Sequence, residues 1–203
     1  MKALLIVDVQ RDFCPGGALP VKGGHEVVPI INSIMEKFNL VIATQDWHPK
    51  GHGSFASTHG KKTGAIITLS GLPQILWPDH CVQGSKGAEF VETLNQDKIT
   101  RVFQKGTEKD VDSYSGFFDN GRRKATGLGD YLKDKGVTDV YVVGLATDYC
   151  VKFTALDAAG LGFTTHLIVE GCRGVDLNEG DVDRAIEDMR KVGVKIIKEV
   201  RDV

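Results

Sequence analysis

The feature that most constrains the fold is a series of short apolar runs, rich in β-branched residues, that recur along the chain. Most are apolar almost throughout, which is typical of strands buried on both faces of a parallel sheet. Helical periodicity fills much of the intervening sequence, and two of these helical patterns end at a glycine, a common helix stop. The alternation predicts an α/β fold, a three-layer α/β/α sandwich with a central, mostly parallel sheet and right-handed crossovers. The predicted strands cover residues 3–7, 40–43, 101–103, 140–143, 165–169 and 194–197.

One segment interrupts this alternation. From residue 45 to about residue 88 the sequence has little periodicity and contains glycine and proline throughout. A stretch of this length without regular structure inside a compact domain is usually functional or disordered. Its two tryptophans and four histidines argue against disorder. With no internal repeat or linker, we expect a single domain over residues 1–203, with this segment as an irregular excursion.

Charge and apolar content exclude several classes of protein. The 25 Lys and Arg residues and 27 Asp and Glu residues give a net charge of −2, whereas nucleic-acid and anionic-membrane binders need a basic excess. No apolar run approaches the roughly 18 residues of a membrane span, and the apolar start of the chain is too short for a signal peptide. The four cysteines are widely spaced without a CxxC pair, so we expect free thiols and a cytoplasmic protein.

Reactive side chains follow three of the predicted strands. Asp8 follows the first strand and Lys105 follows the run at 101–103, while Cys150 lies in the turn between a strand and a predicted helix. Ligands of open parallel sheets bind beyond the carboxyl ends of the strands. A thiol at a helix N-terminus also meets the positive end of the peptide dipoles, which favours the thiolate. An acid, a cation and a thiol at one sheet edge predict a nucleophilic enzyme.

A candidate metal site lies in the irregular segment. Asp46 and His48 have the spacing at which two side chains of an extended backbone point the same way. With His80 from the same segment they form a two-histidine, one-carboxylate set that can hold Zn²⁺, Fe²⁺ or Mn²⁺ and leave positions open for water or substrate. His52, four residues after His48, could add a fourth ligand.

Taken one at a time, these residues also have ordinary structural interpretations. Asp8 could accept turn N–H groups, Lys105 could be a surface lysine, and Phe13 and Trp77 could be core aromatics. Buried cysteines are usually inert small hydrophobes. The common placement of the candidate site residues at one predicted sheet edge favours the functional interpretation. Cys14 and Cys172 are expected to be such inert core residues, and Cys81, beside His80, is either a core residue, which is favoured, or a soft extra ligand. The histidines expected at the surface or at helix ends are His25, His59 and His166.

Together these motifs resemble the nicotinamidase/pyrazinamidase group of the isochorismatase-like cysteine hydrolases. The resemblance runs from residue 5 to about residue 175, and the order and spacing of its blocks make it specific. No position departs from the pattern at the triad or the metal site, and the metal-site histidines distinguish the chain from isochorismatases proper. The matching blocks are residues 5–13, 15–19, 44–49, 52–55, 77–84, 105–106, 113–117 and 144–151.

The resemblance implies a catalytic triad of Asp8, Lys105 and Cys150. It also implies a cis peptide bond between Leu145 and Ala146, and an oxyanion hole formed by the N–H groups of Ala146 and Cys150.

The resemblance further implies one divalent metal ion on Asp46, His48 and His80. Zinc is the expected ion, with Fe²⁺ or Mn²⁺ as alternatives, and His52 matches a fourth ligand found in some members. The pyridine ring would lie between Phe13 and Trp77. The full set of residues expected to bind the substrate is Phe13, Trp77, Tyr114, Leu145 and Ala146.

The implied activity is hydrolysis of nicotinamide to nicotinate and ammonia through a thioester, in NAD salvage, with pyrazinamide as a further substrate. The expected partner is the small-molecule substrate, with no nucleic acid and no membrane, and the oligomeric state stays open. Alternatives are another carboxamide or ureide hydrolase of the superfamily, or a non-catalytic relative that binds a metal or ligand. An Fe(II) oxygenase would use the metal ligands, but it leaves Asp8, Lys105 and Cys150 unexplained.

Overall fold

A six-stranded, entirely parallel sheet forms the centre of the protein. The computed structural model describes residues 1–203, and the strands lie in the order β5-β2-β1-β6-β7-β8. All six predicted strands are confirmed, and parallel pairing between every pair of neighbours confirms the predicted α/β class. Their bounds are β1 Lys2–Val7, β2 Leu40–Asp46, β5 Arg101–Lys105, β6 Asp139–Leu145, β7 Thr164–Arg173 and β8 Lys195–Ile197.

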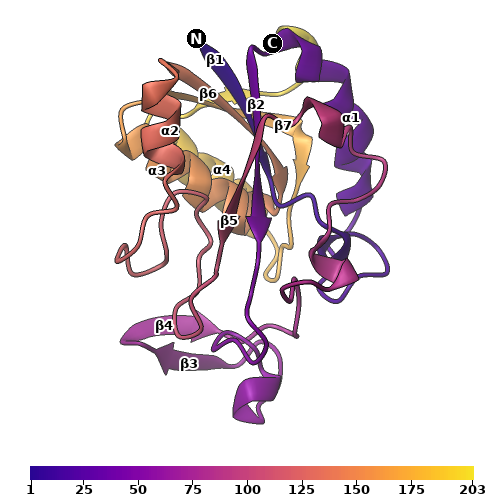
Figure 1. Ribbon diagram of the computed structural model, residues 1–203, viewed down its shortest axis with the longest axis vertical. Coiled ribbons are helices and arrows are strands. Elements are labelled where there is room, and N and C mark those ends of the chain that lie inside the picture. Colours follow the sequence, from indigo (N-terminus) through magenta and orange to yellow (C-terminus); the bar gives the residue numbers. More distant parts are fainter.

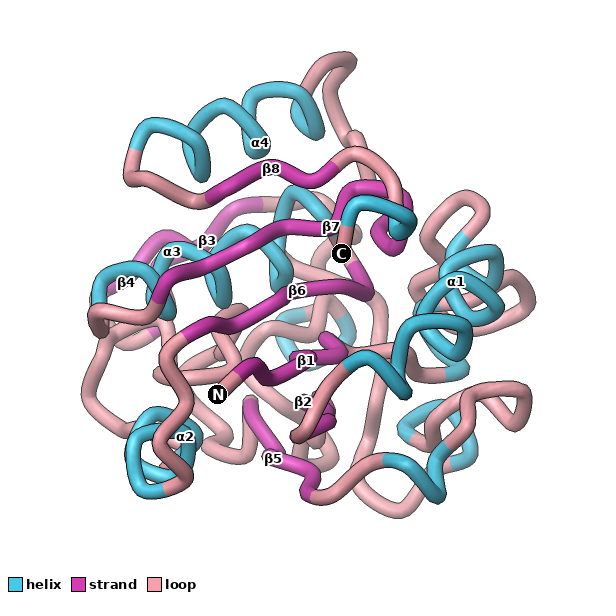
Figure 2. Tube along the Cα trace, turned by 90° about the horizontal axis from the view of Figure 1, so that it is seen from above, coloured by secondary structure: helices cyan, strands magenta, loops and turns pink.

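Helices cover both faces of the sheet and complete the three layers (Figure 2). Alternate residues of β1 face opposite layers: Leu4 and Ile6 pack in a core with α1, whereas Leu5 and Val7 pack in a second core with α2 and α3. This burial on both faces is why the strand reads as apolar throughout. None of the helices is both long enough and apolar enough to cross a membrane. The helices are α1 Val27–Ile34, α2 Leu128–Asp134, α3 Lys152–Gly160 and α4 Asp181–Lys191.

The strand order brings the carboxyl ends of β1, β2, β5 and β6 together. From β1, the chain adds β2 and β5 on one side and β6, β7 and β8 on the other, so a crevice opens at the point where the strand order reverses. The register pairs Asp46 with Lys105 at the ends of β2 and β5. Two of the predicted site residues are therefore neighbours in the sheet itself.

The irregular segment after β2 contains a small hairpin that the sequence analysis did not predict. Strands β3 Ile66–Leu69 and β4 Leu72–Ile75 pair antiparallel and lie beyond the carboxyl ends of β2 and β5 (Figure 1). Ser70 and Gly71 form the tip, with φ angles of 49° and 85°. Positive φ at both central residues is the mark of a two-residue type I′ hairpin turn.

Candidate active site

Lys105 lies at the centre of the site and is fully buried. Its Nζ lies 2.9 Å from Oδ2 of Asp8 and forms a second ion pair with Asp46. It also donates to the backbone oxygen of Ser113 at 2.8 Å and contacts Sγ of Cys150 at 3.4 Å. The structure therefore brings Asp8, Lys105 and Cys150 together, although they are far apart in the sequence.

Each of these three groups is positioned by the end of a strand. Asp8 directly follows β1 with a φ of 49°, Lys105 is the last residue of β5, and Cys150 lies in a π-helical turn, η7 (Thr147–Val151), after β6. Thr44 of β2 donates its hydroxyl to Oδ1 of Asp8 at 2.7 Å. Oδ2 of Asp8 has only the ion pair with the lysine and no directed hydrogen bond, so it retains a lone pair that can accept a proton.

The buried charges act on one another strongly. Burial alone would lower the pKa of Lys105, but the carboxylates of Asp46 and Asp8 outweigh it and raise that pKa well above its ordinary value. Burial raises the pKa of Asp8, and the charge of Lys105 opposes this rise. Burial also acts to raise the pKa of Asp46, but Lys105 and His48 hold it well below the ordinary value. Lys105 is thus an ammonium shared by two carboxyl groups.

The thiol of Cys150 differs from the sequence-based expectation. Burial raises the pKa of Cys150 well above its ordinary value; Lys105 opposes this rise, while Asp8 and Asp46 add to it. Loss of hydration and two nearby carboxylates thus outweigh the helix terminus, which favours the thiolate. The resting group is a protonated thiol that needs a base, and a carboxyl oxygen of Asp8 lies within 4.8 Å of its sulfur.

The predicted metal ligands also converge. Oδ2 of Asp46 lies 3.5 Å from Nε2 of His48 and 3.8 Å from Nε2 of His80. Nδ1 of His48 contacts the carbonyl of Gly106 at 2.9 Å, and Nδ1 of His80 contacts the carbonyl of Pro78 at 2.8 Å. A carbonyl only accepts, so each Nδ1 carries the hydrogen and each Nε2 offers a lone pair. Metal-binding histidines are commonly held in this way, with the other ring N–H donated to a carbonyl.

The residues present fit a divalent metal ion. Nε2 of His48 is buried and has no hydrogen-bond partner, which in a native interior calls for an unseen partner such as an ion. A carboxylate and two histidines whose ligand atoms lie within 4.8 Å of one another form a donor set suited to zinc or iron.

His52 is differently placed. Its Nε2 contacts the carbonyl of Glu108 at 2.9 Å and must carry the hydrogen, while its Nδ1 contacts the hydroxyl of Ser54 at 2.7 Å. Both ring nitrogens thus have hydrogen-bond partners, and His52 lies in a second metal-type group with His48 and Asp112, whose ligand atoms are within 4.8 Å of one another. A role for His52 as a fourth ligand stays a prediction.

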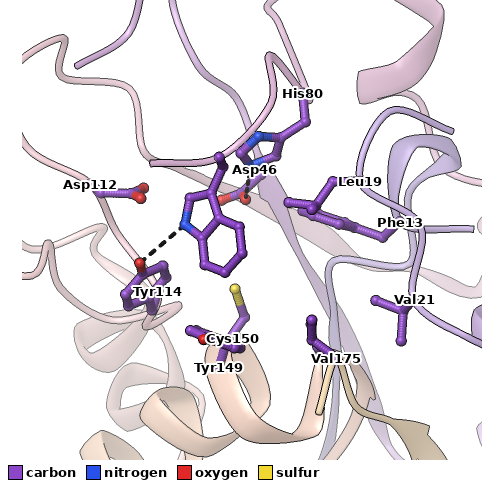
Figure 3. A pocket seen from close by; sticks show the side chains of 12 residues that line it. Phe13, Leu19, Val21, Asp46, His80, Asp112, Tyr114, Tyr149, Cys150 and Val175 are labelled. Atoms are coloured by element: carbon purple, nitrogen blue, oxygen red, sulfur yellow. Dashed lines mark hydrogen bonds and ion pairs between the residues drawn. The ribbon is translucent and has the colours of Figure 1, made fainter. Parts of the chain in front are cut away.

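A largely apolar pocket connects the thiol with the metal-type residues. The sulfur of Cys150 points into it, a carboxylate oxygen of Asp46 lies within 4.8 Å of this sulfur, and His80 lies next to Asp46 (Figure 3). Of the residues expected to bind the substrate, Phe13, Trp77, Tyr114 and Ala146 line the pocket. Leu145 does not, because its side chain is buried in the core shared with α1. The sequence analysis missed five further lining residues: Leu19, Val21, Asp112, Tyr149 and Val175.

Hydrogen bonds and ring contacts fix one wall of this pocket. Nε1 of Trp77 donates to the hydroxyl of Tyr114 at 3.2 Å, and Gln74 of β4 donates to the same hydroxyl at 3.3 Å. The hairpin thus supports the pocket wall from outside. Tyr149 packs edge to face against both Trp77 and Tyr114.

The backbone at the start of η7 faces the same pocket. The peptide bond between Leu145 and Ala146 is cis, as the resemblance implied. The carbonyl of Ala146 accepts from the N–H groups of Tyr149 and Val151, both at 3.1 Å, whereas the N–H of Ala146 makes no backbone hydrogen bond.

The fold and the site together define a class of protein: a three-layer α/β chain that carries a buried thiol, lysine and aspartate beside a metal-type donor set. The chain belongs to the isochorismatase family, because the isochorismatase domain matches it over residues 2–199.

Known relatives match nearly the full length of the chain. A nicotinamidase of Escherichia coli K12 is 50% identical over 199 residues, which cover 96% of this chain and 93% of the relative. The structure of a nicotinamidase/pyrazinamidase of Acinetobacter baumannii superposes with a TM-score of 0.96 at 44% identity, covering 100% of this chain and 98% of the other. A pyrazinamidase of Pyrococcus horikoshii, solved in complex with zinc, superposes with a TM-score of 0.79 at 40% identity, covering 97% and 98%.

Proposed function

We propose that this protein hydrolyses nicotinamide to nicotinate and ammonia, as a metal-containing cysteine amidohydrolase. The observation that carries the proposal is the contact of Lys105 with Asp8, Asp46 and Cys150, because it joins the thiol and its base to the metal-type donor set of Asp46 and His80 beside one pocket. The pocket thus holds the nucleophile and two of the metal-type residues, with the base Asp8 buried within 4.8 Å of the sulfur. The nicotinamidase from E. coli at 50% identity supports the same substrate.

Asp46, His48 and His80 would hold the metal ion, and zinc is favoured because the Pyrococcus relative was solved with zinc. When bound, the ion supplies a Lewis-acidic position, with waters completing its shell, that orients the pyridine nitrogen; Fe²⁺ and Mn²⁺ suit the same donors. Phe13 and Trp77 line the space between this position and the thiol and provide the apolar surface for the ring.

The protein's own groups carry the first half of the reaction. Asp8 takes the thiol proton of Cys150 through Oδ2, which has no directed hydrogen bond, and Lys105 stabilises the thiolate that results. The sulfur attacks the carboxamide carbon. The resulting oxyanion is held by the N–H groups of Ala146 and Cys150, and such donors are each typically worth about 3–4 kcal/mol.

The second half returns the site to its starting state. Asp8 gives its proton to the departing nitrogen, because ammonia leaves an amide only after protonation. It then removes a proton from a water molecule that attacks the thioester on Cys150. Nicotinate is released and the thiol is restored. Pyrazinamide shares the carboxamide and a ring nitrogen, so the same steps apply to it.

The runner-up is hydrolysis of another carboxamide or of a ureide by the same triad. The pocket favours an aromatic heterocycle over a polar ureide, because nine of its twelve lining residues are hydrophobic. A role in NAD salvage in the cytoplasm follows from the proposed substrate and agrees with four free cysteines.

The test is release of ammonia by the purified, metal-loaded protein from four compounds: nicotinamide, pyrazinamide, benzamide and the ureide allantoate. We expect nicotinamide and pyrazinamide to be hydrolysed well and benzamide, which lacks the ring nitrogen, poorly. Preference for the ureide would contradict the proposal, and equal rates for benzamide and nicotinamide would contradict the role assigned to the metal site.

A further inference from the structure

A buried carboxylate beside the nucleophile holds a distant segment of the chain. Asp148 lies in η7, two residues before Cys150, and is buried. Its Oδ1 accepts the backbone N–H of Val175 at 2.9 Å, and its Oδ2 accepts the N–H of Asp176 at 2.8 Å. The reaction steps above use no atom of this side chain, so its two hydrogen bonds need another explanation.

The held segment, residues 174–176, is packed tightly between η7 and α4. A Cβ on Gly174 would lie 2.2 Å from Cγ2 of Val182 and 3.1 Å from Oδ1 of Asp148, so only glycine fits there. Asp176 has a φ of 53° and accepts the N–H of Val182 at 3.2 Å. Asp148 from one side and α4 from the other therefore fix this short segment.

Val175 is the part of this segment that reaches the pocket. It is the one lining residue that follows Cys150 in the sequence, and it lies on the same side of the pocket as the thiol (Figure 3). Its backbone N–H is bound by Asp148, which belongs to the same turn as the nucleophile. The thiol and the Val175 wall are thus held at a fixed separation by one side chain.

We propose that Asp148 is a positioning residue that holds Val175 against the ring pocket and thereby restricts the substrate to single-ring heteroaromatic carboxamides. The inference rests on the proposed function for its substrate class. If one of the two N–H groups lost its acceptor, the segment would move away from η7 and the pocket would widen beside the thiol. The chemical groups at Asp8, Lys105 and Cys150 would stay in place.

Two variants and one matched control test this inference. Asp148→Asn keeps the size of the side chain but turns one acceptor into a donor that faces an N–H. Val175→Ala removes the wall and leaves the carboxylate intact. Asp119→Asn is the control, because Asp119 is also buried and accepts two consecutive backbone N–H groups, those of Arg123 and Lys124, both at 2.9 Å. Asp119 does not line the substrate pocket.

The first readout is the kinetics of nicotinamide against the two-ring quinoline-3-carboxamide. Loss of one apolar contact in a pocket changes discrimination by about 10-fold or more, so we expect KM for nicotinamide to rise about 10-fold in both pocket variants. We expect kcat to stay within about twofold, because the contact supports binding and not the chemical step. The ratio of kcat/KM for the two-ring amide to kcat/KM for nicotinamide should rise in both pocket variants. In Asp119→Asn this ratio should match that of the wild type. A fall in kcat with KM unchanged would overturn the inference.

The second readout needs no substrate. Alkylation of Cys150 is followed by mass spectrometry with iodoacetamide, which is small, and N-phenylmaleimide, which is bulky. We expect Asp148→Asn and Val175→Ala to accelerate the bulky reagent selectively, with no labelling of Cys14, Cys81 or Cys172. Equal acceleration of both reagents, or labelling of those buried thiols, would indicate loosened folding and overturn the inference.

The two readouts separate failure of this inference from failure of the proposed function. If the wild type released no ammonia from nicotinamide, the proposed function would fail while the alkylation ratio still tested the wall. If Asp148→Asn did not fold, Val175→Ala would still test the inference. An unchanged ratio of the Cys150 alkylation rates with the bulky and the small reagent in this variant would overturn it.

Discussion

Replacing Lys105 with methionine tests how strongly the charge of Lys105 stabilises the two buried carboxyl groups of the site. Lys105 is fully buried and forms ion pairs with both Asp8 and Asp46. Methionine has a similar length and shape but no charge, so Lys105→Met removes the cation with little change in packing. Two buried carboxyl groups then lose their shared partner. We expect the metal-loaded variant to be inactive, and the metal-free variant to be much less stable than the metal-free wild type.

The size of the loss follows from the ion-pair geometry. At the 2.9 Å separation of Lys105 and Asp8, an effective dielectric constant of about 20 gives an attraction of about 6 kcal/mol. The desolvation of both ions offsets part of this, and removal of one partner from a buried pair typically costs about 3–5 kcal/mol. We expect a decrease of this size in the free energy of unfolding at neutral pH.

The pH dependence of the unfolding free energy tests the same argument, because the loss of Lys105 predicts the sign of its slope. Without the lysine, the folded-state pKa of Asp8, already raised by burial, rises further, and that of Asp46 rises from its lowered value, so the folded variant binds more protons than the folded wild type. The unfolding free energy of the variant then falls as the pH rises through these raised pKa values. As the pH falls, the difference in unfolding free energy between the variant and the wild type becomes smaller. Urea unfolding of chelator-treated protein at two pH values measures both effects.

Lys152→Met is the matched control for this experiment. Lys152 pairs with Asp188 at 2.8 Å, but both side chains are partly exposed, and ion pairs in contact with solvent contribute little to stability. A loss in Lys105→Met no larger than in Lys152→Met, or a deficit that did not shrink on acidification, would refute the reasoning.

Three further predictions address other parts of the site and the core. His48→Ala should lose bound metal, measured by elemental analysis, and raise KM for nicotinamide while Cys150 stays open to iodoacetamide; full metal content with full activity would contradict the metal assignment. Thr44→Val should lower kcat/KM about 10-fold or more, because a hydrogen bond to a charged group is worth about 1.5–3 kcal/mol, and Thr44→Ser should recover most of it; equal activities in the two variants would exclude a role for the hydroxyl bound to Asp8. Burial raises the pKa of Cys172 to about 12 from an ordinary 9.0, so the unfolded chain loses this proton first, and this thiol alone should lower the unfolding free energy by about 1.4 kcal/mol per pH unit above pH 9. Urea titrations at pH 8.5 and 10.5 should therefore show a steeper fall in wild type than in Cys172→Ala, and equal slopes would contradict this assignment.

Much of the fold and the position of the site could be predicted because burial leaves a direct pattern in the sequence. Strands buried on both faces must be apolar throughout, as in β1, and polar residues just beyond them must lie at the sheet edge. The parallel topology then brings Asp8, Lys105 and Cys150 together. The β3–β4 hairpin was missed, although Ser70-Gly71 between two apolar runs is a recognisable turn signal.

Other features depend on tertiary contacts that leave no local pattern. Val175, Asp112 and Tyr149 line the pocket from loops and turns whose direction is set by distant partners, such as Asp148 for Val175. The ionisation of Cys150 depends on burial and on two carboxylates brought near by the fold, so the helix terminus alone gave the wrong direction for its pKa. Leu145 matches a substrate-binding position of the family motif, but its side chain turns into the core.

The central claim is that Cys150 is the nucleophile of an amide hydrolysis, and release of ammonia from nicotinamide by three proteins tests it most directly. The metal-loaded wild type and Cys172→Ala, which alters another buried thiol, should both release ammonia. Cys150→Ala should release none while keeping its metal. Ammonia release by Cys150→Ala at the wild-type rate, or none by the metal-loaded wild type, would contradict the account.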